Sequence, residues 1–64
     1  MTIEDVKRCF EETFPDIQPV VSYTRPFGPG ELLIKFKNNR VLYFHLNEDG
    51  NWSLSERPVN RGAV

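Results

Sequence analysis

The sequence has almost none of the cross-links by which small domains are usually stabilised. Its 64 residues include one cysteine, Cys9, and one histidine, His45. A single thiol cannot form an internal disulfide, and one thiol with one imidazole cannot supply the four ligands of a structural zinc site. We therefore expect no metal and no cofactor. Stability must come from an aromatic core or from self-association.

Long apolar runs are also missing. The longest run, Val41 to Phe44, has the length of a strand and falls far short of a membrane span. The N-terminal segment is acidic and lacks the basic-then-apolar pattern of a secretory signal. A lone thiol suits a reducing compartment. These features predict a soluble cytoplasmic protein that does not bind membranes.

Aromatic residues are abundant for so short a chain, with five Phe, two Tyr and one Trp. Large rings carry much of the burial in a small core, so this content favours a folded domain over a disordered tail. We expect residues 1–57 to form a single α+β domain. Residues 58–64 contain little to bury, which predicts a frayed C-terminal tail.

An amphipathic helix is predicted at the N-terminus. Thr2 is a favourable N-cap, and Glu4 and Asp5 lie where the helix dipole favours carboxylates. One apolar stripe follows at steps of three and four residues, formed by Ile3, Val6, Phe10 and Phe14. Pro15 should end the helix, because the residue before a proline is pushed out of the helical region.

Four segments rich in branched and aromatic residues follow and are predicted to be strands. They are Ile17–Arg25, Leu32–Lys37, Val41–Leu46 and Trp52–Glu56. Pro19 cannot donate to a central ladder, so the first strand should lie at an edge. The predicted fold is α+β, with the helix packed on one face of a four-stranded antiparallel meander.

The turn between the last two strands predicts their register. Asn47-Glu48-Asp49-Gly50-Asn51 has the composition of a type I turn closed by a left-handed glycine. This turn would pair Leu46 with Trp52.

The turn at Asn38-Asn39 allows two registers. A two-residue turn would pair Phe36 with Val41, so that Phe44 would face away from Ile34. An odd-length loop, with Asn39 or Arg40 in the left-handed region, places the large apolar residues of both strands on one face. Burying a large apolar side chain is worth roughly 1.5–3 kcal/mol, which exceeds any turn preference. We therefore expect the odd loop.

With this register, the opposite face of the sheet carries Leu33, Lys35, Lys37, Val41, Tyr43 and His45, with Ser53 and Ser55. The helix has one apolar stripe and can cover only one face, so the second face should meet solvent or a partner. Acidic and basic residues are also divided between the predicted helix and the predicted sheet. Residues 1–16 hold five carboxylates against two basic side chains, and residues 17–46 hold four basic side chains against one carboxylate.

No catalytic group is predicted. Cys9 lies on the buried stripe of the helix and His45 on the far face of the sheet, so the sheet would separate them. The remaining carboxylates lie on the outside of the helix or in turns, where nothing would raise a pKa. Pro29 removes an amide donor from Gly28-Pro29-Gly30, which is therefore a turn and not a phosphate loop. We expect a non-enzymatic protein without a small-molecule substrate.

The second face of the sheet is the candidate binding site. Its predicted residues are Lys35, Lys37, Arg40, Tyr43 and His45, with Leu33 and Phe27 as apolar anchors. Basic groups beside a ring suit an acidic protein partner, and they also suit single-stranded nucleic acid. A net charge of −1 makes nucleic acid the weaker alternative. An ordinary solvent-facing surface, over which the lysine stems lie, is the third interpretation.

Phe27 and the last strand leave further alternatives open. Phe27 lies in a loop, where a large ring either folds back onto the domain or docks into a partner. The last strand is short and should be an edge that could pair with a second copy. A homodimer could also form by packing of the two second faces. The expected role is that of an accessory or regulatory protein of bacterial or phage origin.

Overall fold

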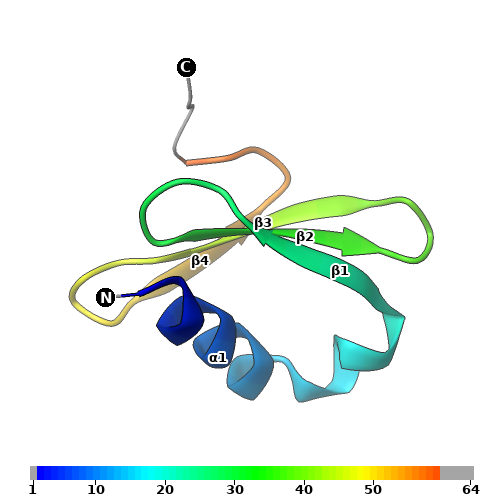
Figure 1. Ribbon diagram of the computed structural model, residues 1–64, viewed down its shortest axis with the longest axis horizontal. Coiled ribbons are helices and arrows are strands. Elements are labelled where there is room, and N and C mark those ends of the chain that lie inside the picture. Colours follow the sequence, from blue (N-terminus) through cyan, green and yellow to red (C-terminus); the bar gives the residue numbers. More distant parts are fainter. Residues whose placement is uncertain (1, 60–64) are drawn as a thin grey trace.

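A capped amphipathic helix begins the fold, which a computed structural model describes for residues 2–59 (Figure 1). Helix α1 spans Ile3–Thr13, and Thr2 is its N-cap. The Thr2 hydroxyl accepts the Asp5 N–H at 3.3 Å, and the Asp5 carboxylate accepts the Thr2 N–H at 3.1 Å. The predicted cap is confirmed, and it is a reciprocal capping box.

The capping box makes helix stability depend on pH. The hydrogen bond from the Thr2 backbone N–H, with a contribution from the Thr2 hydroxyl, holds the pKa of Asp5 below its usual range. A lowered pKa adds stability above the unfolded value, and that stability is lost as pH falls through the folded value. We predict that Asp5→Asn is less stable than the wild type at neutral pH. The difference should shrink as pH falls below the usual aspartate pKa of about 4, as followed by circular dichroism in urea titrations. A stability difference that does not change with pH would show that the charge of Asp5 does not contribute to the cap.

The segment after α1 differs from the prediction. Residues Pro15–Val20 form a 3-10 helix, η1, and strand β1 is confined to Val21–Pro26. The prediction of strand from Ile17 is therefore wrong for residues 17–20. Pro15 and Pro19 each fix φ near −65° and lack an N–H for a strand ladder, and both properties favour a tight helical turn. The Gln18 side chain donates to the Phe14 carbonyl at 2.8 Å and closes this turn.

The four strands form one antiparallel sheet in the order β1-β2-β3-β4, so the predicted α+β meander is confirmed. The other strands are β2 (Glu31–Phe36), β3 (Val41–Leu46) and β4 (Trp52–Ser55). Strand β1 lies at an edge as predicted, although Pro19 belongs to η1 and not to the strand. A bulge between Val21 and Tyr23 lets Val21 pack against the core while Tyr23 pairs with Lys35 on the other face.

The loop between β2 and β3 has the odd register. Asn39 has φ of 73°, in the left-handed region, and Phe36 N–H donates to Arg40 C=O at 2.8 Å. Ile34 pairs with Leu42 and Leu32 pairs with Phe44. The predicted register is confirmed, with Asn39 as the left-handed residue. The second hairpin is confirmed as well, because Gly50 has φ of 92° and Leu46 pairs with Trp52.

We predict that Asn39→Ala lowers the free energy of unfolding by about 1 kcal/mol, because a Cβ-bearing residue without a short polar side chain is strained at positive φ. Asn39→Gly is the matched control, since glycine adopts this conformation freely. It should leave stability within about 0.5 kcal/mol of the wild type. Urea denaturation measures both values. If both substitutions lowered the free energy of unfolding equally, the left-handed conformation of Asn39 would not be the cause of the loss.

The core lies between α1 and the face of the sheet that α1 covers. Its fully buried members are Val6, Phe10, Leu32, Ile34 and Phe44. The rings of Phe10 and Phe44 lie 5.5 Å apart between centroids, and Trp52 stacks on Phe44 at 5.7 Å. Trp52 nevertheless remains 43% exposed, because the helix packs mainly against β2 and β3.

Candidate binding surface on the outer sheet face

The sheet face opposite α1, called the outer face below, is fixed by strand alternation and register. Side chains of paired residues share a face, and successive residues alternate. The outer face therefore carries Tyr23, Arg25, Glu31, Leu33, Lys35, Val41, Tyr43, His45, Ser53 and Ser55. The structure thus brings Leu33, Lys35 and Tyr43 together as predicted from the register.

Phe27 folds back onto this outer face. Its ring meets Tyr43 edge to face, with 5.1 Å between ring centroids. The loop that carries it is closed by a hydrogen bond of 2.9 Å from Phe27 N–H to Glu31 C=O. Gly30 has φ of 67°, and a Cβ there would lie 2.8 Å from the Leu46 carbonyl. Only glycine lets the loop approach β3 this closely, and the approach brings Phe27 over the sheet.

One end of the outer face is closed by the chain itself. Glu31 is fully buried, and its Oε2 accepts the Val59 N–H at 2.7 Å. The segment after β4 lies on the side of the sheet away from α1 (Figure 1). Pro58 is half-buried, so this part of the predicted tail packs against the domain. Residues 60–64, the rest of that tail, lie outside the described residues.

His45 lies at this closed end, paired across the strands with Glu31. Its Nδ1 is buried and has no hydrogen-bond partner in the described part of the chain. The ring also faces the loop, with Cε1 3.8 Å from the Cβ position that Gly30 lacks. His45 is therefore half-buried beside the Gly30 loop, at the opposite end of the β2–β3 pairing from Lys35. This burial was not predicted, because it depends on how the Gly30 loop folds onto β3.

We predict that Glu31 protects the Val59 amide from hydrogen exchange. In Glu31→Leu the acceptor is lost, so exchange of the Val59 amide should accelerate by about tenfold or more. Glu31→Gln keeps a side-chain oxygen and should retain most of the protection. Amide-resolved NMR exchange measures both, with the Phe44 amide as the internal control. Unchanged exchange at Val59 in Glu31→Leu would mean that the contact does not hold this segment.

The open part of the outer face forms a surface that we call the aromatic–basic patch. It consists of Tyr23, Arg25, Phe27, Leu33, Lys35 and Tyr43. Tyr23 is 46% exposed and lies beside Lys35, its partner across the strands. Tyr23 and Arg25 were not predicted to belong to the candidate site. The Gly28-Pro29-Gly30 loop could have predicted their position, because a three-residue turn closed by Phe27 and Glu31 places Tyr23 opposite Lys35.

The basic side chains near this patch are not neutralised internally. Within residues 2–59, no carboxylate forms an ion pair with Arg25, Lys35 or Lys37. Lys37 is exposed in the turn after β2, and its N–H donates to Val20 C=O at 2.9 Å. The exposed carboxylates Glu4, Glu11 and Glu12 lie on α1, on the other side of the sheet. The two faces of the molecule therefore differ in charge.

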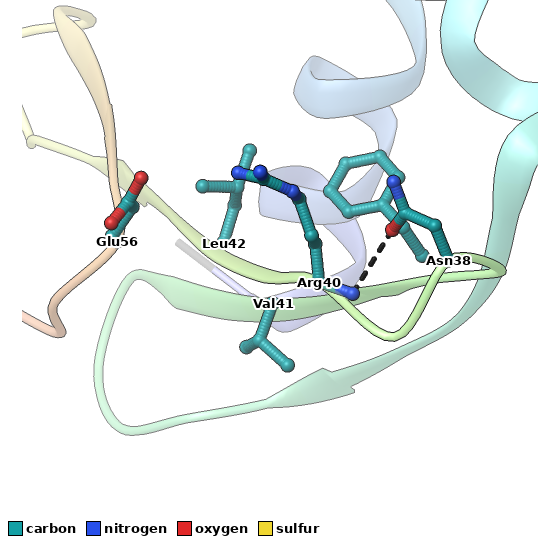
Figure 2. Close-up of a pocket in the computed structure, with 6 residues that line it drawn as sticks. Asn38, Arg40, Val41, Leu42 and Glu56 are labelled. Atoms are coloured by element: carbon teal, nitrogen blue, oxygen red, sulfur yellow. Dashed lines mark hydrogen bonds between the residues drawn. The ribbon is translucent and has the colours of Figure 1, made fainter.

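Arg40 is separated from the patch. Figure 2 shows Arg40 and Leu42 on one side of β3 and Val41 on the other, as strand alternation requires. Arg40 lines an open pocket of about 500 Å³ on the helix side of the sheet. Its lining residues are Phe36, Asn38, Arg40, Val41, Leu42 and Glu56. The Asn38 side chain accepts the Arg40 N–H at 3.0 Å, which fixes the turn beside the pocket.

The geometry also separates the two residues considered for nucleophilic chemistry. Cys9 packs against the core on the helix side, and its Sγ lies 3.9 Å from the Thr13 hydroxyl. His45 lies on the outer face, so the imidazole cannot accept a proton from the thiol. Among residues 2–59, no group of three or more His, Cys, Asp or Glu side chains could hold a metal ion. Nor does this part of the chain contain a helix long and apolar enough to cross a membrane.

No protein-family model matches the chain, and no curated protein or solved structure matches it.

Proposed function

We propose that the protein is a small non-enzymatic binding module whose aromatic–basic patch takes an acidic, partly apolar segment of a protein partner. The observation that supports this proposal is the exposed Tyr23 beside the unneutralised Lys35 and Arg25. Tyrosine and arginine are the residues that most often anchor protein interfaces. An acidic segment would supply the charges that this side of the molecule lacks.

The patch is organised before any partner arrives. Phe27 and Tyr43 pack edge to face, so neither ring has to be ordered on binding. Leu33 lies between Arg25 and Tyr43 in the sheet register and provides an apolar centre. Preorganised rings lower the entropy cost of association. A rigid apolar centre with a basic rim is the usual arrangement of a protein interface.

Single-stranded nucleic acid is the second candidate, because an exposed ring beside a lysine can stack a base while the ammonium meets a phosphate. Tyr23 and Lys35 have this arrangement. Two features of the chain favour a protein partner over nucleic acid. Phe27 and Tyr43 are partly buried and pack on each other, which leaves less ring surface for stacking a base, and the net charge of −1 gives little phosphate neutralisation. The unpaired thiol of Cys9 fits a cytoplasmic setting.

The test is selection of binders from a library of random short peptides displayed on phage, with the purified chain as bait. We predict enrichment of peptides that combine Asp or Glu with apolar residues. Tyr23→Ala and Lys35→Glu should each weaken the selected peptides by about tenfold or more. Lys7→Glu is the matched control, because it makes the same charge change on the exposed side of α1 and should leave affinity unchanged.

The same preparation is titrated with oligo-dT and oligo-rU at low and high salt. Binding of either one at low salt, abolished by Tyr23→Ala, together with no acidic peptide enrichment, would replace the protein interface with the nucleic-acid alternative. Enriched peptides that bind Tyr23→Ala and Lys35→Glu as well as the wild type would show that another surface binds them. Absence of both kinds of ligand would overturn the proposed role of the patch.

A further inference from the structure

The two edges of the sheet are protected to very different degrees. At β1, the Phe27–Glu31 hydrogen bond fixes the ladder so that the backbone groups of Thr24 and Pro26 point outward. Pro26 has no N–H, and the bulge beside Val21 twists the strand away from a regular edge. Proline and bulges are the devices that prevent edge-to-edge pairing.

Strand β4 carries none of these devices. It contains Trp52, Ser53, Leu54 and Ser55, with no proline and no charged side chain, and its register with β3 is unbroken. The Asn47 N–H donates to Asn51 C=O at 2.8 Å. Because bonded and non-bonded pairs alternate, Ser53 and Ser55 bond to β3, and the backbone groups of Trp52 and Leu54 point away from the sheet. No described strand pairs with this edge.

The side chains of β4 are compatible with pairing to a second β4. Antiparallel pairing that centres on Ser53 sets Trp52 opposite Leu54 of the second copy, and the reciprocal pair forms by symmetry. Trp52 is 43% exposed and Leu54 is half-buried, so pairing covers apolar surface that α1 leaves open. On the outer face, Ser53 meets Ser53 of the second copy, and these small side chains do not clash.

Charges beyond the two ends of β4 complement each other in the same arrangement. Antiparallel pairing brings the turn before one β4 beside the segment after the other. The turn exposes Glu48 and Asp49, and the segment after β4 exposes Glu56 and Arg57. In the register centred on Ser53, Arg57 falls beside the acidic turn of the second copy and Glu56 falls beside Gly50, so each acidic turn meets one basic side chain, twice per dimer. Two β4 edges therefore match each other in backbone hydrogen-bonding groups, in apolar surface and in charge.

We propose that the occupant of the β4 edge is a second copy of this chain, paired antiparallel across β4 to give one continuous sheet. The two-fold axis is then perpendicular to the sheet, so both α1 helices lie on one side and both aromatic–basic patches on the other. A specific stable interface buries about 1,200–2,000 Å². A four-residue strand contributes only part of this area, so the dimer is weak and forms at high micromolar concentrations.

Sedimentation equilibrium over about 10 µM to about 1 mM tests the proposal at low salt. The average mass should rise toward twice that of one chain, and salt should weaken the association. Trp52 is the only tryptophan, so its emission should shift to shorter wavelength over the same concentration range. A mass that stays at one chain up to the highest concentration would overturn the proposal.

A pair of matched variants locates the interface. Ser53→Lys places two ammonium groups opposite each other at the two-fold axis and should raise the dimer dissociation constant by about tenfold or more. Ser22→Lys makes the same change at an exposed serine of β1 and should leave the constant unchanged. Circular dichroism confirms that both variants fold. A dimer that tolerates Ser53→Lys, or one that Ser22→Lys disrupts, would exclude β4 as the interface.

Charge reversal gives an independent readout of the arrangement. Glu48→Lys and Arg57→Glu should each weaken the dimer, and the variant that carries both should recover it, because the reversed charges again oppose each other. No recovery would contradict the antiparallel arrangement. The peptide selection described above does not depend on these results. A monomer that still binds acidic peptides would refute the dimer alone, and a dimer without such binding would refute the patch alone.

Discussion

The fold depends on one constraint, the left-handed conformation of Asn39 in the turn between β2 and β3. This residue makes the turn odd in length, so Ile34 pairs with Leu42 and Leu32 with Phe44. A slip by one residue would send Leu42 and Phe44 to the outer face and leave α1 with half a core. The same constraint also determines the outer face, since it places Tyr43 opposite Leu33 there.

Prediction from the sequence succeeded where local chemistry and burial agree. The capping box at Thr2, the turn closed by Gly50 and the odd turn at Asn39 each combine a residue-specific backbone preference with a register that buries large side chains. The prediction was wrong where the branched side chains and the prolines of one short segment favour different structures. Residues 17–20 contain branched side chains typical of strands, but Pro15 and Pro19 favour a 3-10 helix.

The candidate site was predicted only in part, for a different reason. Strand alternation alone places Leu33, Lys35 and Tyr43 together, and this inference needs no contact between distant segments. The buried carboxylate of Glu31 accepts a hydrogen bond from Val59, 28 residues away, and no local pattern encodes this contact. Arg40 was grouped with the patch by its position near Lys35 and Lys37. Arg40 directly precedes Val41, the first residue of β3, and lies on the same side of the sheet as Leu42 instead (Figure 2).

A single helix of eleven residues cannot cover a four-stranded sheet, and the remaining surface is divided unequally. On the helix side, α1 contacts β2 and β3 and leaves Leu42 in an open pocket and Trp52 partly exposed. On the outer face, the Phe27 loop and the segment before Val59 close one end. The chain thus covers its own surface at the Glu31 end and leaves Tyr23 and the β4 edge uncovered. Tyr23 is exposed and no described strand pairs with the outer edge of β4, so a partner at either place would not have to displace part of the fold.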